Sequence, residues 1–253
     1  MGNDSLEGIS RAPLLGQTAV IIRKAILDGR LPPGQKLNEA ALARQLGMSR
    51  GPVREALRLL TEHGLVRWEA HKGTFVADFT VQDLVEVVTV RDLLEPLAVS
   101  AALTEPHPGL LPGLRTALEA MHSAASSDDF QGLAQAHERF HGTFYTRSRH
   151  LLLGALWERM EAPLRLYVTV HQASFGPPTI IAEQHDEIFR LAETGDIPAL
   201  QKHAREHLAA NLKSVLARLS TPNLDQALEL LQRMGPDASR LVASLAPDRV
   251  QTE

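Results

Sequence analysis

Cysteine is absent from the 253 residues of this chain, which excludes a disulfide framework and any metal site built on thiolates. Also missing is any apolar run that approaches the roughly 18 residues needed to span a membrane. The first ten residues are polar and lack the apolar core of a signal peptide. We therefore expect a cytoplasmic protein that has no membrane partner.

Aromatic residues are scarce, at 4% of the chain, while Ala and Leu are abundant. That mixture favours helices packed on helices over sheets. Hydrophobic residues make up 44% and charged residues 22%, close to the values of an average soluble protein. Because the length suits two domains of ordinary size, we predict a mainly α protein with two domains.

Charged residues are unevenly distributed, although the net charge is only −4. Residues 11–76 contain 11 Lys and Arg against 5 Asp and Glu, whereas residues 77–253 contain 15 against 23. A basic N-terminal segment on an acidic body is typical of a DNA-reading module carried by a separate domain. A solvated surface with a chance asymmetry is the alternative.

The N-terminal segment has the pattern of a helix-turn-helix. Residues 15–28 predict a first helix, and Asn38 is placed to cap a second one that ends at Gly47, which we expect in a left-handed conformation. Ser49 is a favourable N-cap for a third helix. Pro52 falls in the first turn of that helix, where its missing N–H costs little. Helix, tight turn and capped helix together predict the helix-turn-helix motif.

Arginines recur on the face of the third helix opposite its apolar stripe. Arg50, Arg54 and Arg58 are four residues apart, and a guanidinium can contact guanine in the major groove or clamp a phosphate. The N-terminal end of a recognition helix enters the groove, so Arg50 and Arg54 are better candidates for base contacts than Arg58. The alternative is a solvated arginine face with salt bridges to Glu55 or Glu62.

A hairpin is predicted directly after this helix. Residues 65–68 and 75–76 read as short strands around a glycine-containing turn. The tip carries His71 and Lys72, which suits a wing that contacts a neighbouring phosphate or the minor groove. An ordinary exposed turn is the alternative.

The remainder of the chain shows only helical patterns, which predict an antiparallel six-helix bundle. We expect a winged helix-turn-helix domain over residues 1–78, a helical domain over 79–220, and a C-terminal extension over 221–253 that forms a short helix or stays partly disordered. The predicted helices of the bundle are 81–103, 109–125, 129–147, 150–172, 178–194 and 197–219.

Arg91 falls in the middle of the apolar stripe of the first bundle helix. A buried cation without a partner is costly, so Arg91 must meet a carboxylate. That partner is either an Asp or Glu on a facing helix or an acidic ligand in the bundle core.

Histidines form a second unusual pattern in the bundle. His137 and His141 are four residues apart and share a helix face, as do His203 and His207, while His185 lies on the helix between. Such pairs converging in a bundle core suit a divalent metal. An exposed histidine pair is the common alternative.

Six motifs keep a constant spacing over residues 11–77: Leu31-Pro32-Pro33-Gly34, Leu37-Asn38-Glu39, Leu42-Ala43, Leu46-Gly47-Met48-Ser49-Arg50, Pro52-Val53-Arg54-Glu55-Ala56-Leu57 and Gly64-Leu65-Val66. Together they resemble the GntR family of bacterial regulators. The resemblance implies a winged helix-turn-helix that binds a palindromic operator as a homodimer. It places Ser49, Arg50, Gly51 and Arg54 near bases and phosphates, and His71, Lys72 and Gly73 at the wing tip. Some relatives carry a basic residue where this chain has Ala40, so that contact is not available here.

Residues 80–218 resemble the ligand-binding FCD domain of the FadR-like branch, through Val90-Arg91-Asp92-Leu93-Leu94-Glu95-Pro96, Phe140-His141, Gln184-His185-Asp186-Glu187-Ile188 and His207-Leu208. Many members hold a metal with one Asp and three His, and the three His correspond to His141, His185 and His207. The Asp position is His137 here. His137 either ligates, in a four-His set that would favour zinc or nickel, or turns away and leaves its place to water. His203 is expected at the surface.

The same resemblance implies that Arg91 contacts a carboxylic-acid effector, with Arg165 and Tyr167 as weaker candidates for lining the pocket. We expect a DNA-binding transcription regulator, a repressor, that responds to a small organic acid, and not an enzyme. The competing hypothesis is a metal-dependent hydrolase with Glu138 or Glu183 as base. An intact DNA-reading domain argues against it.

Overall fold

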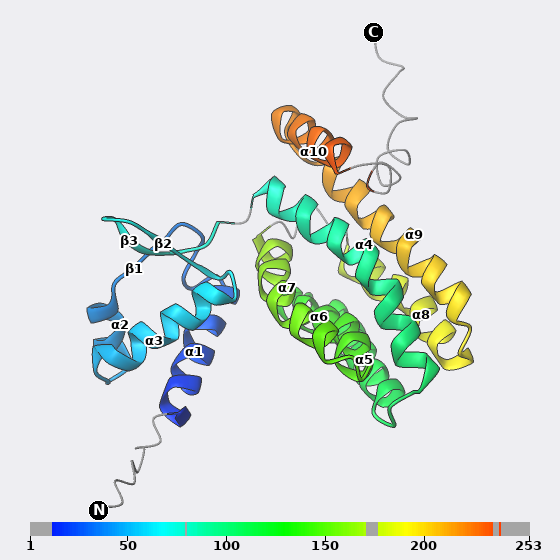
Figure 1. Cartoon of the computed structure of the whole chain (residues 1–253), viewed down its shortest axis with the longest axis horizontal. Coiled ribbons are helices and arrows are strands. Elements are labelled where there is room, and N and C mark those ends of the chain that lie inside the picture. Colours follow the sequence, from blue (N-terminus) through cyan, green and yellow to red (C-terminus); the bar gives the residue numbers. More distant parts are fainter. Residues whose placement is uncertain (1–11, 79, 171–176, 235–237, 239–253) are drawn as a thin grey trace, which may run out of the picture. The chain divides into compact units, whose positions relative to one another are not determined.

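The computed structural model describes residues 12–78, 80–170, 177–234 and 238, and for 12–15 and 166–170 it describes the backbone alone. It separates into two units, Met1–Asp78 and Phe79–Glu253 (Figure 1). The mainly α fold class predicted from the sequence is confirmed, because helices dominate both units.

Over residues 12–78, the described part of the first unit, the chain forms three helices and a small antiparallel sheet. The sheet has the strand order β1-β3-β2, so the hairpin formed by β2 and β3 is extended by an earlier strand. The elements are α1 (Ala12–Leu27), β1 (Lys36–Leu37), α2 (Glu39–Gln45), α3 (Arg50–Glu62), β2 (Val66–Glu69) and β3 (Gly73–Val76).

Local signals explain the helix-turn-helix. The Asn38 side chain accepts hydrogen bonds from the backbone N–H groups of Ala40 and Ala41, at 2.9 and 3.0 Å, and so caps α2. Gly47 has a φ of +65°, the left-handed conformation that ends α2 and turns the chain towards α3. On α3, the predicted apolar stripe of Val53, Ala56, Leu57 and Leu60 is buried. This stripe packs α3 against α1 and α2 and leaves the opposite face exposed.

Strand β1 was not predicted, because the preceding segment 31–34 reads as a turn and two residues are too few for an alternating pattern. The pairing partners are Lys36 with Phe75 and Leu37 with Thr74. Leu37 is buried. The pairing of β1 holds the base of the wing beside the start of α2.

The second unit contains seven helices among the described residues. Six of them, α4 to α9, correspond to the six predicted bundle helices, and α10 begins the C-terminal extension. Their bounds are α4 (Val81–Thr104), α5 (Leu110–Ser126), α6 (Phe130–Arg147), α7 (Leu151–Val170), α8 (Pro178–Thr194), α9 (Ile197–Leu216) and α10 (Thr221–Arg233).

Helix ends in this unit coincide with residues that terminate helices. Thr80 and Asp83 form a capping box at the start of α4. Asp129 and Asp196 cap α6 and α9 through their side chains. Gly195, with a φ of +68°, ends α8. These local signals explain why the sequence predicted the helix boundaries well.

Two main apolar clusters, and a small one that contains Ala134 and Leu164, hold the described part of the bundle together. The larger main cluster joins α4 to α9 around Phe140, Phe144, Met121 and Leu114. The other main cluster lies where α10 packs against α4 (Figure 1). The sequence expectation for 221–253 allowed a short helix, and α10 is such a helix; residues 235–237 and 239–253 lie outside the described part of the chain.

Candidate functional sites

On the recognition helix α3, Arg54 is held by a carboxylate on α2. Its Nε donates to both Glu39 oxygens at 3.2 and 3.1 Å, and its Nη2 donates to Oε2 at 2.9 Å. This contact raises the pKa of Arg54 through the hydrogen bond and the charge of Glu39. Since 66% of the Arg54 side chain remains exposed, the guanidinium is oriented by Glu39 and still accessible to DNA.

The other two arginines of α3 have different surroundings. Arg58 forms salt bridges with Glu55 at 3.3 Å and Glu62 at 2.5 Å, which is the solvated alternative considered for this face. Arg50 is exposed in the first turn of α3. Ser49 occupies the predicted N-cap position, but its side chain makes no capping hydrogen bond. Arg50, Ser49 and the neighbouring Gly51 thus lie together at the end of α3 that a recognition helix inserts into the groove.

The wing turn is formed by residues in unusual backbone conformations. His71 has a φ of +63° and Gly73 a φ of +110°. Lys72 extends at the tip, where its Nζ lies 3.0 Å from Glu69. Trp68, on β2, is 67% exposed and borders a groove of about 470 Å³ that is also lined by Arg54 of α3. The groove therefore separates the recognition helix from the wing.

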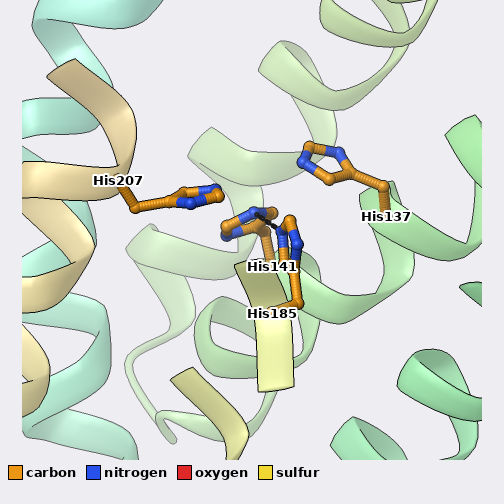
Figure 2. Close-up of side chains that lie close together, drawn as sticks. All are labelled: His137, His141, His185 and His207. Carbon is orange, nitrogen blue, oxygen red and sulfur yellow. Dashed lines mark hydrogen bonds between the residues drawn. The ribbon is translucent and has the colours of Figure 1, made fainter. Parts of the chain in front are cut away.

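In the second unit, the structure brings together the four histidines selected from the sequence. His137 and His141 come from α6, His185 from α8 and His207 from α9. Figure 2 shows the rings of His141 and His185 at the centre, with His207 and His137 approaching from opposite sides. One ring nitrogen from each lies within 4.8 Å of the others, a separation that suits one ion placed between them. His203 is not part of this cluster.

Hydrogen bonds determine which nitrogen of each central ring points inwards. His185 Nδ1 lies 2.7 Å from the carbonyl oxygen of Ile181, which can only accept, so this nitrogen carries the proton. His141 Nδ1 lies 2.5 Å from Glu95 Oε1. The inward Nε2 atoms of His141 and His185 therefore present lone pairs to each other at 3.0 Å. A cation between them would relieve this repulsion, so the donor set fits a metal ion.

Burial keeps these imidazoles neutral, as metal ligation requires. Desolvation lowers the pKa of His185 to about 4. It is also the main cause of the lowered pKa values of His137, His141 and His207, with further lowering from neighbouring imidazoles. At neutral pH all four rings can donate a lone pair.

Arg91 has a carboxylate partner that differs from both sequence alternatives. Its Nε and Nη2 donate to Glu95 Oε2 at 3.0 and 2.7 Å. Glu95 lies four residues later on α4 itself, neither on a facing helix nor in a ligand. Both side chains are buried. A spacing of four residues between Arg and Glu is a known helix pairing, so the sequence did contain the signal for this pair.

Sequence reasoning also missed two residues beside the cluster. Tyr145 follows His141 by one helical turn on α6 and is 1% exposed. No partner meets the full hydrogen-bond geometry at its hydroxyl in the described structure, but the Arg91 guanidinium lies close enough to interact with it through hydrogen bonding and charge, and the charge of Glu95 also reaches it. Burial raises its pKa, so it stays a neutral donor. Asn211 Nδ2 lies 2.9 Å from Nε2 of His207 and so orients that ring.

Arg165 and Tyr167 are the weaker candidates for binding the effector, and the structure describes the side chain of Arg165 alone. Arg165 lies 3.6 Å from Glu138 in a largely buried ion pair between α7 and α6. The Tyr167 side chain lies outside the described part of the chain. Neither observation places these residues at the histidine cluster.

Comparison with known proteins identifies the chain. Residues 15–76 match the family model described as bacterial regulatory proteins of the gntR family, and residues 86–210 match the FCD domain. The chain belongs to the GntR family. It is a transcription regulator with a DNA-binding domain and not an enzyme, and the hydrolase hypothesis has no support.

Two GntR relatives and one solved structure illustrate the match. The chain is 32% identical over 202 residues to the "Probable D-xylose utilization operon transcriptional repressor" of Paenarthrobacter nicotinovorans, covering 80% of this chain and 88% of the relative. It is 24% identical over 193 residues to the gluconate operon transcriptional repressor of Bacillus subtilis, covering 74% and 79%. A GntR regulator structure from Rhodococcus sp. RHA1 has the same fold, with a TM-score of 0.73, 23% identity and coverage of 83% and 100%.

Across the helices that are described, none combines the length and the apolar character that crossing a membrane would require.

Proposed function

We propose that this GntR regulator is a repressor whose hold on its operator is controlled by a small carboxylic acid bound beside a divalent metal in the α4–α9 bundle. The observation that carries the proposal is the cluster of the partly buried His137 with the buried His141, His185 and His207, next to the Arg91–Glu95 pair. A bundle core with neutral metal ligands and a buried cation offers both elements that a chelating acid needs.

The DNA-binding end uses a homodimer on a palindromic operator. Arg50 and Arg54 contact bases in the major groove, with Ser49 and Gly51 close to the backbone. Arg58 has a secondary role, because Glu55 and Glu62 already neutralise it. The wing tip, formed by His71, Lys72 and Gly73, contacts a neighbouring phosphate or the minor groove.

The metal is zinc or nickel, because a set of neutral imidazoles favours borderline ions over those that prefer oxygen. His137 is the fourth ligand in the position where many family members have Asp. When bound, the ion supplies a Lewis-acidic anchor for the oxygen atoms of the acid.

The acid is recognised by charge and by hydrogen bonding. Arg91 provides the cation, and the buried Tyr145 hydroxyl provides a neutral donor one turn from His141. Arg165 and Tyr167 remain weaker pocket candidates on α7. The gluconate repressor among the relatives supports a hydroxylated acid as the effector class, since such an acid offers several oxygens to a metal and a donor.

Control of DNA binding requires a difference in affinity. The acid must favour an arrangement of the two DNA-binding domains of the dimer that fits the operator half-sites poorly. An acid that binds both arrangements equally would change nothing.

The test combines operator selection with effector titration. Full-length protein selects its operator from a random library, and binding to that operator is then titrated with gluconate and related hydroxy acids in the presence of zinc. We expect a palindromic site and an operator affinity that falls with at least one acid. If no acid changes the affinity of a zinc-loaded protein, acid control is wrong. Steady turnover of an acid would contradict the regulator-only function.

A further inference from the structure

We propose that Glu95 couples the acid-binding arginine to the metal, so that the acid and the metal bind cooperatively. The inference rests on the proposed function and deepens it, because it names the residue through which the two ligands affect each other. Glu95 acts as a positioning residue and contacts neither the acid nor the metal in this role.

Each oxygen of the Glu95 carboxylate serves a different partner. Oε2 accepts two hydrogen bonds from Arg91, at 3.0 and 2.7 Å. Oε1 lies 2.5 Å from Nδ1 of His141. The side chains are only 5% exposed for Arg91, 7% for Glu95 and 2% for His141, so their contacts are shielded from solvent. Arg91 and His141 are therefore joined by one buried carboxylate.

Because the Arg91 guanidinium donates to Oε2, the other oxygen, Oε1, is free to accept a hydrogen bond from the N–H of His141 Nδ1. Such a carboxylate fixes the ring orientation and makes the opposite nitrogen a better ligand. That opposite nitrogen, Nε2, faces His185 at 3.0 Å, inside the histidine cluster. Glu95 therefore prepares His141 for the metal.

The same carboxylate divides its negative charge between Arg91 and His141. When an acid neutralises Arg91, the pull of the guanidinium on Glu95 weakens and Glu95 interacts more strongly with His141. In a buried network such changes are poorly screened and spread along the chain of hydrogen bonds. Acid binding should therefore tighten metal binding, and by linkage metal binding should tighten acid binding by the same factor.

Zinc binding in the absence of an acid tests the coupling. A substitution at Arg91 imitates the protein whose arginine is neutralised by the acid, and a substitution at Glu95 removes the carboxylate that connects Arg91 to His141. The measurement is the zinc Kd of the full-length protein, obtained by competition with a chelating dye. We expect Glu95→Gln to weaken zinc binding about 10- to 100-fold, as for other outer-shell partners. Arg91→Met, which removes the competing cation as an acid would, should tighten it. Glu86→Gln is the control, since it removes an acid from the exposed face of α4.

A double mutant separates coupling from independent effects. If Glu95 carries the coupling, Arg91→Met should have much less effect on zinc binding when Glu95 is already Gln. The absorption spectrum of the cobalt-loaded Glu95→Gln protein should remain that of the wild type, because Glu95 orients His141 and does not itself bind the metal. Equal effects of Arg91→Met in both backgrounds would overturn the coupling.

The outcomes distinguish this inference from the proposed function. If the wild type binds zinc and Glu95→Gln binds it equally well, the role of Glu95 is wrong and the metal site stands. If the wild type binds neither zinc nor nickel, both proposals fail. If Glu95→Gln does not fold, a looser zinc Kd for Arg91→Met than for the wild type would by itself contradict the predicted sign.

Discussion

Arg54 lies one helical turn after Arg50 on α3, and its guanidinium is oriented by Glu39 from α2. A bidentate arginine contact to guanine contributes about 1–3 kcal/mol of base discrimination. We expect Arg54→Ala to lose specific operator binding while the fold survives, because the side chain is mostly exposed. Gel-shift titrations with operator and random DNA check this. Arg58→Ala is the matched control and should have a smaller effect; unchanged operator affinity in Arg54→Ala would refute its role.

His141 and His185 occupy the centre of the histidine cluster and contribute its two facing nitrogens. Removing both leaves too few ligands, so His141→Ala with His185→Ala should abolish bound metal. Elemental analysis of the purified protein measures this directly. His203→Ala, four residues before His207 but outside the cluster, should retain full metal content. A double variant that also retains it would remove the proposed site.

Tyr145 combines a stacked ring with a buried hydroxyl that lacks a well-formed hydrogen bond. Tyr145→Phe keeps the stacking on Trp157, so we expect little change in stability or in metal content. The acid concentration that releases the operator should rise roughly two- to tenfold, the loss expected for one hydrogen bond. A release curve identical to that of the wild type would show that the hydroxyl does not touch the acid.

The contact between α6 and α7 depends on a glycine. A Cβ on Gly142 would clash with Nε1 of Trp157, so the indole would have to move. We expect Gly142→Ala to destabilise the bundle by about 1–3 kcal/mol and to shift the fluorescence of Trp157. Urea denaturation measures the change.

Gly154 on α7 is the matched control for Gly142. A Cβ there meets no atom within 4 Å, and alanine favours a helix over glycine by about 1 kcal/mol. Gly154→Ala should therefore be neutral or stabilising. Equal destabilisation by both substitutions would show that the Trp157 contact is not the cause.

Helix α10 is an element that the family models leave out, since the FCD match ends at residue 210. Its buried residues Leu224, Ala227 and Leu231 share one face and pack with Leu84 and Val88 of α4. The extension thus completes the core beside the first half of α4, the helix that later carries Arg91 and Glu95.

At the scale of the whole molecule, metal binding should affect the two units differently. The histidine cluster lies entirely within the second unit. An ion that binds only the folded state stabilises it by about 2.7 kcal/mol when its free concentration is 100 times Kd. We expect zinc to raise the Tm of the second unit and a chelator to reverse this, while residues 1–78 are unaffected. Differential scanning calorimetry checks it; an unchanged thermogram would contradict specific zinc binding.

The sequence alone determined much of the local structure of this protein. Helix caps such as Asn38 and Asp129, the left-handed Gly47 and the apolar stripe of α3 act within one or two helical turns, so a linear pattern contains them. The family motifs predicted which residues read DNA, and the spacing of His137 and His141 indicated a shared face.

Only the tertiary structure decided what these residues meet. Three contacts join segments that are separated in the chain. They are the pairing of β1 with β3, the salt bridge between Glu39 and Arg54, and the approach of His185 and His207 to the histidines of α6. Arg91 shows the same limit at short range: Glu95 was one of several carboxylates it could have met. The choice depended on how α4 packs against α6, because that packing brings His141 to the other oxygen of Glu95.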